Sequence, residues 1–124
     1  MTDKNGVELY VKRGKIGILV SPGYGAGWST WNQKELAYDK RVVDYWLAHK
    51  DDEDFMANVD SFSENDDKEE VAAFFESLGY HSVYLGGFNQ IVMRYVKPGV
   101  KWKISEYDGW ESLETENDDD FIAF

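Results

Sequence analysis

Residues 100–114, VKWKISEYDGWESLE, constrain the fold more than any other stretch of the chain. Val100, Trp102 and Ile104 alternate with polar residues, which is the period of a strand with one buried face. Asp108 and Gly109 favour a two-residue hairpin turn, because both residue types tolerate a positive φ. We therefore expect residues 100–107 and 110–114 to form an antiparallel hairpin.

The same alternation predicts two more groups of strands. VELYVKR (7–13) and IGILVS (16–21) indicate an N-terminal hairpin with its turn at 14–15. YHSVYL (80–85) and QIVMRYV (90–96) indicate two strands that precede the hairpin of 100–114. The C-terminal part should thus be an antiparallel meander, interrupted at Pro98, which has no N–H for a strand ladder.

The middle of the chain changes to the period of a helix. Residues 39–50 predict a helix capped by Asp39, and residues 65–79 predict one that is capped by Asn65 and ends at Gly79. Residues 51–65 indicate an irregular or short helical segment. The side chains expected to face the core are Val42, Val43, Trp46 and Leu47 in the first helix, Phe55, Met56, Val59 and Phe62 in the short segment, and Val71, Phe74, Phe75 and Leu78 in the second helix.

Together these elements predict an α+β fold. The N-terminal hairpin and the C-terminal meander should form one antiparallel sheet, covered by about two helices. The 124 residues, 43% of them hydrophobic, suit a single domain over 1–124 with a modest core. An acidic tail at about 114–124 ends in Phe121, Ile122 and Phe124. These residues either dock on the body of the domain, which is the favoured interpretation, or form a recognition tail.

The net charge of −11 is distributed unevenly. Residues 51–76 contain eleven acidic residues and one lysine, and residues 105–124 contain eight acidic residues and no basic one. Such a chain repels phosphate backbones, so we expect no direct binding to nucleic acid. The acidic blocks are either a solvated surface or a face that binds a basic partner. The candidate residues for such a face are Asp51, Asp52, Glu53, Asp54, Asp66, Asp67, Glu69, Glu70, Asp118, Asp119 and Asp120.

The absence of cysteine excludes disulfides, thiolate catalysis and cysteine-ligated zinc. The polar first 15 residues have no apolar region typical of a secretory signal, and no apolar run reaches the roughly 18 residues of a membrane span. We therefore expect a cytoplasmic protein that does not contact membranes.

The glycine-rich stretch SPGYGAGWSTWN (21–32) allows two interpretations. It lacks the spacing of a phosphate-binding loop and has no basic residue between 16 and 33, so a tight bend with Trp28 and Trp31 packed on the core is one reading. In the other, Tyr24, Trp28 and Trp31 form an aromatic surface that binds a protein or a base-like ligand, and Ser29 and Thr30 add hydrogen bonds. A nucleotide-like ligand would then take its phosphate contacts from neighbouring strands. The candidates for those contacts are Lys12, Arg13, Lys15, Arg94, Lys97, Lys101 and Lys103.

Little in the sequence indicates catalysis. His49 should end the first helix, where a cation is favoured, and His81 should be an exposed strand residue. Neither histidine belongs to a known nucleophile motif, and the runs DDED (51–54) and NDDD (117–120) lack the spacing of a calcium loop. We predict no catalytic residues, no metal and no cofactor.

Three stretches, GYGAGWSTWN, LAYDKRVVDYW and KWKISEYDGWESLE, resemble small proteins of tailed bacteriophages that have no assigned activity. The resemblance implies a phage product in a bacterial cytoplasm. The first functional hypothesis is thus a non-enzymatic acidic protein that binds, and inhibits, a host protein with a basic surface. If that surface normally binds nucleic acid, the acidic blocks would imitate a phosphate backbone. The alternative is a module that binds or sequesters a nucleotide-like molecule with the glycine–tryptophan loop.

Overall fold

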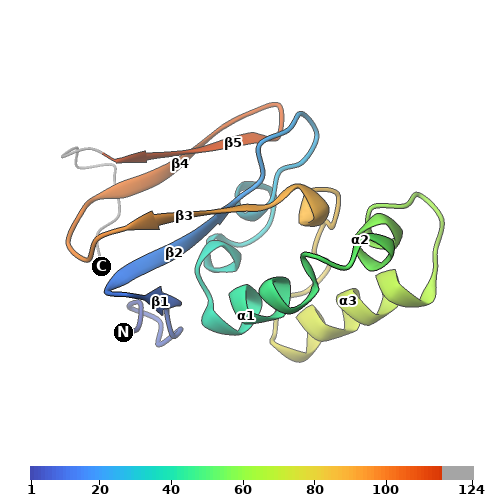
Figure 1. The fold of residues 1–124 in the computed structure, drawn as a ribbon, viewed down its shortest axis with the longest axis horizontal. Coiled ribbons are helices and arrows are strands. Elements are labelled where there is room, and N and C mark those ends of the chain that lie inside the picture. Colours follow the sequence, from blue (N-terminus) through green and yellow to red (C-terminus); the bar gives the residue numbers. More distant parts are fainter. Residues whose placement is uncertain (116–124) are drawn as a thin grey trace.

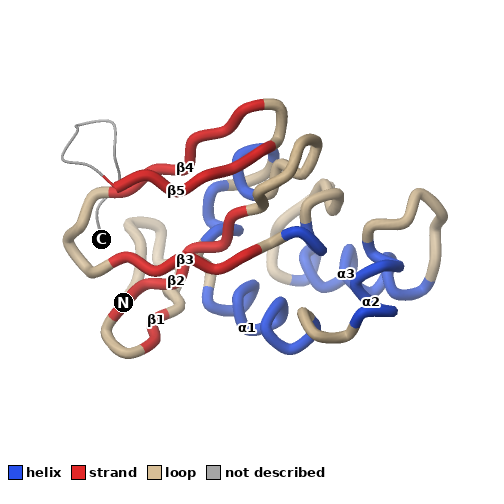
Figure 2. Tube along the Cα trace, turned by 45° about the horizontal axis from the view of Figure 1, so that its top comes forward, coloured by secondary structure: helices blue, strands red, loops and turns tan. Residues whose placement is uncertain are grey.

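The computed structural model describes residues 1–115, which form a single α+β domain. The strands gather on one side of the molecule and the three α-helices on the other (Figures 1 and 2). The elements follow the chain in the order β1 (Val11–Lys12), β2 (Lys15–Val20), η1 (Ser29–Trp31), η2 (Lys34–Ala37), α1 (Lys40–His49), α2 (Glu53–Val59), α3 (Asp66–Ser77), η3 (Phe88–Gln90), β3 (Val92–Val96), β4 (Trp102–Tyr107) and β5 (Trp110–Thr115).

The strand β2 is the centre of an antiparallel sheet in the order β1-β2-β3. Its side chains alternate between two cores, because successive residues of a strand point to opposite faces. Ile16 and Ile18 belong to one buried cluster together with Trp102 of β4, whereas Leu19 belongs to a second cluster with the helices. Residues 16–20 are therefore buried on both faces.

The strands β4 and β5 form a separate two-stranded sheet. Asp108 and Gly109 adopt φ values of 50° and 86°, and the residues that flank them, Tyr107 and Trp110, are cross-strand partners. The predicted hairpin is thus confirmed. Its buried residue Trp102 packs on the β2–β3 sheet.

Side chains at their N-termini cap the three α-helices. Asp39 and Asn65 accept hydrogen bonds from the backbone N–H groups of Arg41 and Lys68, as the sequence predicts for α1 and α3. Asp52 does the same for α2, so the segment after α1 is a short helix. The residues that these helices bury are Val42, Val43, Trp46, Phe55, Met56, Val59, Val71 and Phe75.

A buried carboxylate joins α1 to the segment after α3. Asp39 is fully buried and accepts hydrogen bonds from Arg41 Nη2 at 2.7 Å and from the Tyr80 hydroxyl at 2.7 Å. Burial acts to raise the pKa of Asp39, but the hydrogen bonds from Arg41 and Tyr80 outweigh it and hold that pKa below its ordinary value. Asp39 is therefore ionised and fully paired at neutral pH.

Several details differ from the sequence-based expectations. Residues 80–85 are not a strand: Ser82 takes a φ of 53°, and the Tyr84 N–H donates to the side chain of Asn32 instead of to a ladder. The expected meander is therefore wrong. The strand β3 pairs with β2, so the strands form two sheets rather than one, and three α-helices rather than about two accompany them. Phe62, expected in the core, is fully exposed.

Glu114 and Thr115, placed in the tail by the sequence, belong to β5. The other residues of the predicted tail, including Asp118, Asp119 and Asp120 and the apolar end expected to dock, lie outside the described residues. Among residues 1–115, none of the helices combines the length and the apolar composition of a membrane span.

Candidate functional site

The glycine-rich loop between β2 and η1 is fixed by one buried carboxylate of β5. Glu111, 1% exposed, accepts hydrogen bonds from the N–H and hydroxyl of Ser21, at 3.0 and 3.3 Å, through one oxygen. Its second oxygen accepts from the N–H and hydroxyl of Thr30, at 2.9 and 2.5 Å. Because Ser21 and Thr30 stand at the two ends of the loop, a single side chain closes it.

The middle of the loop lies against the β4–β5 turn. The N–H groups of Gly25 and Gly27 donate to the carbonyls of Asp108 and Gly109, both at 2.7 Å. A Cβ atom on Gly109 would lie 2.8 Å from the backbone nitrogen of Ala26, so only glycine permits this backbone-to-backbone approach. The glycines thus serve close packing of the loop on the hairpin, not a phosphate cradle.

The loop sends one tryptophan into the core. Trp28 is fully buried, its indole N–H donates to the Leu36 carbonyl at 3.0 Å, and its ring lies 5.6 and 5.8 Å from the rings of Phe75 and Phe88. Ser29 is also buried. Trp28 and Ser29 therefore do not contribute to a binding surface as predicted, because Trp28 is part of the hydrophobic core and Ser29 is buried beside it in sequence.

Five other rings stay at the surface around the same loop, and we call them the aromatic surface. Their members are Tyr24, Trp31, Tyr84, Tyr107 and Trp110, with relative exposures of 67%, 43%, 44%, 76% and 45%. The ring of Tyr24 lies edge-on to Trp110 at 5.2 Å and to Tyr107 at 6.4 Å, and the ring of Trp31 lies 5.4 Å from Tyr84. The Tyr84 hydroxyl donates to the Gly25 carbonyl at 2.7 Å and so connects the two groups.

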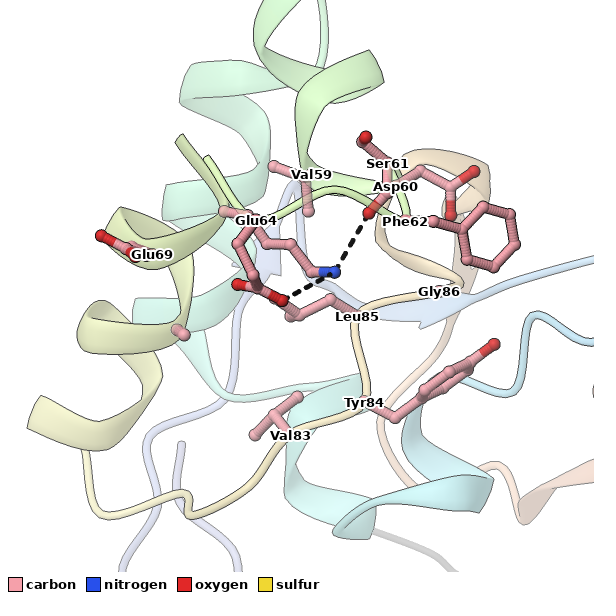
Figure 3. A pocket seen from close by; sticks show the side chains of 12 residues that line it. Val59, Asp60, Ser61, Phe62, Glu64, Glu69, Val83, Tyr84, Leu85 and Gly86 are labelled. Atoms are coloured by element: carbon pink, nitrogen blue, oxygen red, sulfur yellow. Dashed lines mark hydrogen bonds and ion pairs between the residues drawn. The ribbon is translucent and has the colours of Figure 1, made fainter. Parts of the chain in front are cut away.

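A groove of about 470 Å³ adjoins this surface (Figure 3). The end of α2, the start of α3 and residues 83–86 form its walls, and Tyr84 lines it, so the groove and the aromatic surface share a side chain. Three carboxylates, of Asp60, Glu64 and Glu69, line the groove together with the exposed ring of Phe62. We call it the acidic groove.

One cation, Lys68, also lines the acidic groove. Its Nζ donates to the Ser61 carbonyl at 3.0 Å and lies 3.7 Å from a carboxylate oxygen of Glu64 (Figure 3). The acidic groove therefore keeps more negative than positive charge.

The other predicted acidic residues lie at the surface of the helical side. Asp51, Glu53, Asp54, Asp66 and Glu70 are exposed, and Asp51 lies 3.2 Å from Lys50. Two others serve the fold, since Asp52 caps α2 and Asp67 accepts a hydrogen bond from Asn58 at 2.8 Å. Of the predicted acidic residues that fall within 1–115, only Glu69 lines the acidic groove.

The structure does not bring the predicted phosphate contacts to the glycine-rich loop. Lys12, Arg13 and Lys15 lie at the β1–β2 turn, which is the opposite end of β2 from the loop (Figure 1). Six strand residues span about 20 Å, too far for one ligand contact to serve both ends. Arg94 and Lys97 lie in and after β3, and Lys101 and Lys103 at the start of β4, the end remote from Tyr107. The geometry therefore does not favour a nucleotide in the glycine–tryptophan loop.

The two histidines take local partners. His49 ends α1, as predicted, and stacks on Phe55 at 4.3 Å. His81 lies in an exposed loop rather than a strand, where its hydrogen bond to Glu76 lowers the pKa of that carboxyl. Within residues 1–115, no three His, Asp or Glu side chains are placed to hold a metal ion together.

Sequence reasoning missed the residue on which the site is built. Glu111 and its cross-strand partner Glu106 occupy the face on which Trp102, Ile104 and Leu113 are directed inward. Charged residues that continue an apolar face of a strand are the signal that could have identified it. Comparisons of the chain with protein-family models, with curated proteins and with solved structures find no match.

Proposed function

We propose that this protein is a non-enzymatic interaction protein that binds a basic surface of a partner protein through its aromatic surface and its acidic groove. The observation that carries the proposal is their continuity at Tyr84, which belongs to both. Exposed aromatic rings beside carboxylates suit a partner that presents lysine or arginine side chains, because such cations interact with ring faces and with carboxylates.

The loop that carries part of the aromatic surface is held in place, and this supports a role of the surface in binding. Tyr24 sits in a loop that is fixed at both ends by Glu111 and in the middle by the β4–β5 turn. Aromatic side chains that are already ordered lose little conformational entropy on binding, and such residues dominate the energy of many interfaces.

The acidic charge of the protein supports a partner with a basic surface. The chain carries a net charge of −11, and its α2–α3 region contributes the acidic groove as well as the exposed acidic residues around it. A surface of one sign attracts an oppositely charged partner before contact, and it speeds association most at low ionic strength. Taken with the resemblance to bacteriophage proteins, we propose a host protein in a bacterial cytoplasm as the partner, with inhibition as the result of binding.

A capture experiment with paired variants tests this proposal. The immobilised protein is exposed to bacterial lysate at low and at high salt, and any retained protein is purified and titrated. We expect the double variant Tyr24→Ala, Trp110→Ala and the double variant Glu64→Gln, Glu69→Gln each to weaken binding at least about tenfold. Tyr95→Ala is the matched control, since Tyr95 is 43% exposed, close to the 45% of Trp110, but lies on β3.

The proposal requires both parts of the site. Binding that survives both double variants, or that does not weaken as salt is raised, would contradict it. Circular dichroism of each variant shows whether the fold is retained, so that a loss of binding is attributed to the surface.

A further inference from the structure

The turn between β1 and β2 carries the sequence Lys12-Arg13-Gly14-Lys15, a concentrated positive charge on a chain of net charge −11. Lys12 and Lys15 are direct cross-strand partners in the register of this hairpin. Like charges directly opposite each other destabilise a hairpin. The turn therefore has an arrangement that stability alone disfavours.

The backbone conformation of Arg13 is a second feature that destabilises the turn. Its φ is 53°, in the left-handed region that glycine and asparagine occupy with less strain. Asparagine at this position would serve the turn better, because Asn-Gly is the preferred pair for such a hairpin. Backbone strain of this kind is concentrated at functional positions.

The register also brings an aromatic ring to the same face. Tyr95 of β3 is the cross-strand partner of Gly17, and Gly17 and Lys15 point to one face of β2 because they are two residues apart. The ring of Tyr95 is 43% exposed. Lys12, Arg13, Lys15 and Tyr95 together line an open pocket of about 280 Å³.

Within the part of the chain that the structure describes, the three cations have no partner of opposite charge. Among residues 1–115, no carboxylate forms an ion pair with Lys12, Arg13 or Lys15, although acidic residues outnumber basic ones 24 to 13 in the sequence. Three unpaired cations around one pocket favour an anion with several oxygens, and phosphate is the group that arginine and lysine bind best in this way.

We propose that this pocket is a second binding site, separate from the aromatic surface and the acidic groove, for a small phosphate-bearing molecule. The size of the ligand follows from the distribution of charge. The turn lies on the opposite side of the molecule from α2 and α3 (Figures 1 and 2), and β2 alone spans about 20 Å, more than twice the Debye length of about 8 Å at physiological salt. A small anion at the turn is thus screened from the acidic surface, whereas a long polyanion would extend over it and be repelled.

Amide chemical shifts of the ¹⁵N-labelled protein test the site directly. We expect ADP and tripolyphosphate to produce saturable shifts at Lys12–Lys15 and Tyr95, and adenosine to produce none. Arg13→Asn removes the guanidinium but suits the turn, so it should lower the affinity for both phosphates about tenfold while the melting temperature stays equal or rises. Lys50→Gln is the matched control, because it removes one positive charge from the far end of α1 and should change neither quantity.

A Tyr95→Leu variant identifies the source of the phosphate. A loss of affinity for ADP but not for tripolyphosphate assigns a nucleotide that stacks on the ring, and equal affinities in both proteins assign an oligophosphate. The site is refuted if no phosphate gives saturable shifts up to about 5 mM, if Arg13→Asn and Lys50→Gln have equal effects, or if a single-stranded oligonucleotide binds more tightly than ADP. None of these results depends on whether a basic protein partner is found.

Discussion

Replacing Glu111 by glutamine tests whether one buried carboxylate holds the glycine-rich loop in place. Each of its oxygens accepts one backbone N–H and one hydroxyl, from Ser21 on one side and from Thr30 on the other. The glutamine side chain has the same shape, but one oxygen becomes an NH₂ group that cannot accept a hydrogen bond. Whichever way the amide is oriented, the N–H of Ser21 or of Thr30 loses its partner.

The magnitude follows from these four contacts. A buried N–H without an acceptor costs about 1–3 kcal/mol, and bonds to a neutral acceptor are each weaker than bonds to a carboxylate by about 1 kcal/mol. Burying a neutral glutamine costs less free energy than burying a carboxylate, and this offsets part of the loss in stability. We therefore expect Glu111→Gln to lower the free energy of unfolding by about 2 kcal/mol, out of the 5–15 kcal/mol typical of a domain.

Urea and thermal unfolding, followed by circular dichroism, measure the change. A loss of about 2 kcal/mol corresponds to a fall in Tm of about 8 °C for a domain of this size. Glu114→Gln on the same strand is the control, since Glu114 is exposed, 3.8 Å from Lys103, and should change stability by less than about 0.5 kcal/mol. A change for Glu111→Gln as small as that of the control would refute the structural role given to Glu111.

Three further predictions follow from buried contacts and are measured by the same unfolding assays. Gly109→Ala should lower the free energy of unfolding by about 3 kcal/mol, because Gly109 has a φ of 86° and the new Cβ would lie 2.8 Å from the backbone of the glycine-rich loop. Gly14→Ala should lower it by about 1 kcal/mol, because Gly14 has a φ of 75° but open space around it. Equal losses for the two variants would contradict the close approach of the loop to Gly109. Trp28→Ala should cost at least about 3 kcal/mol, and a smaller loss would mean that its ring is not part of the core. Tyr80→Phe should lower the free energy of unfolding by about 1–2 kcal/mol at pH 7. This loss should become smaller as the pH falls through the lowered folded-state pKa of Asp39, because the carboxylate that accepts the Tyr80 hydrogen bond loses its charge there. A loss that stays constant with pH would contradict the pairing of Tyr80 with Asp39.

Local patterns predicted most of the secondary structure but not how the strands associate. The caps at Asp39 and Asn65 and the turn at Asp108 depend on neighbours within a few residues, so the sequence shows them. The pairing of β3 with β2 joins segments about 75 residues apart, and alternation alone does not specify a partner. Residues 80–85 have the composition of a strand, but the hydrogen bond between Tyr84 and Asn32 gives them another role.

The site was predictable to the extent that its residues are conspicuous by type. The sequence singles out the glycine-rich loop and its aromatic residues, and Tyr24 and Trp31 are exposed there. The sequence does not show which of two tryptophans enters the core, because that depends on the orientation of the loop on the β4–β5 turn. It also does not show that Tyr84 lies beside Trp31, since the two are brought together only by tertiary structure.

The bond between Ser21 and Glu111 spans 90 residues of sequence, and this has a consequence for synthesis. A nascent chain that has not yet released β5 from the ribosome lacks the carboxylate that closes the loop, and it lacks Trp110 as well. Contacts of such high sequence separation require the closure of a long loop of chain, which slows folding. The glycine-rich loop is therefore held in place only after β5 has been synthesised and has paired with β4.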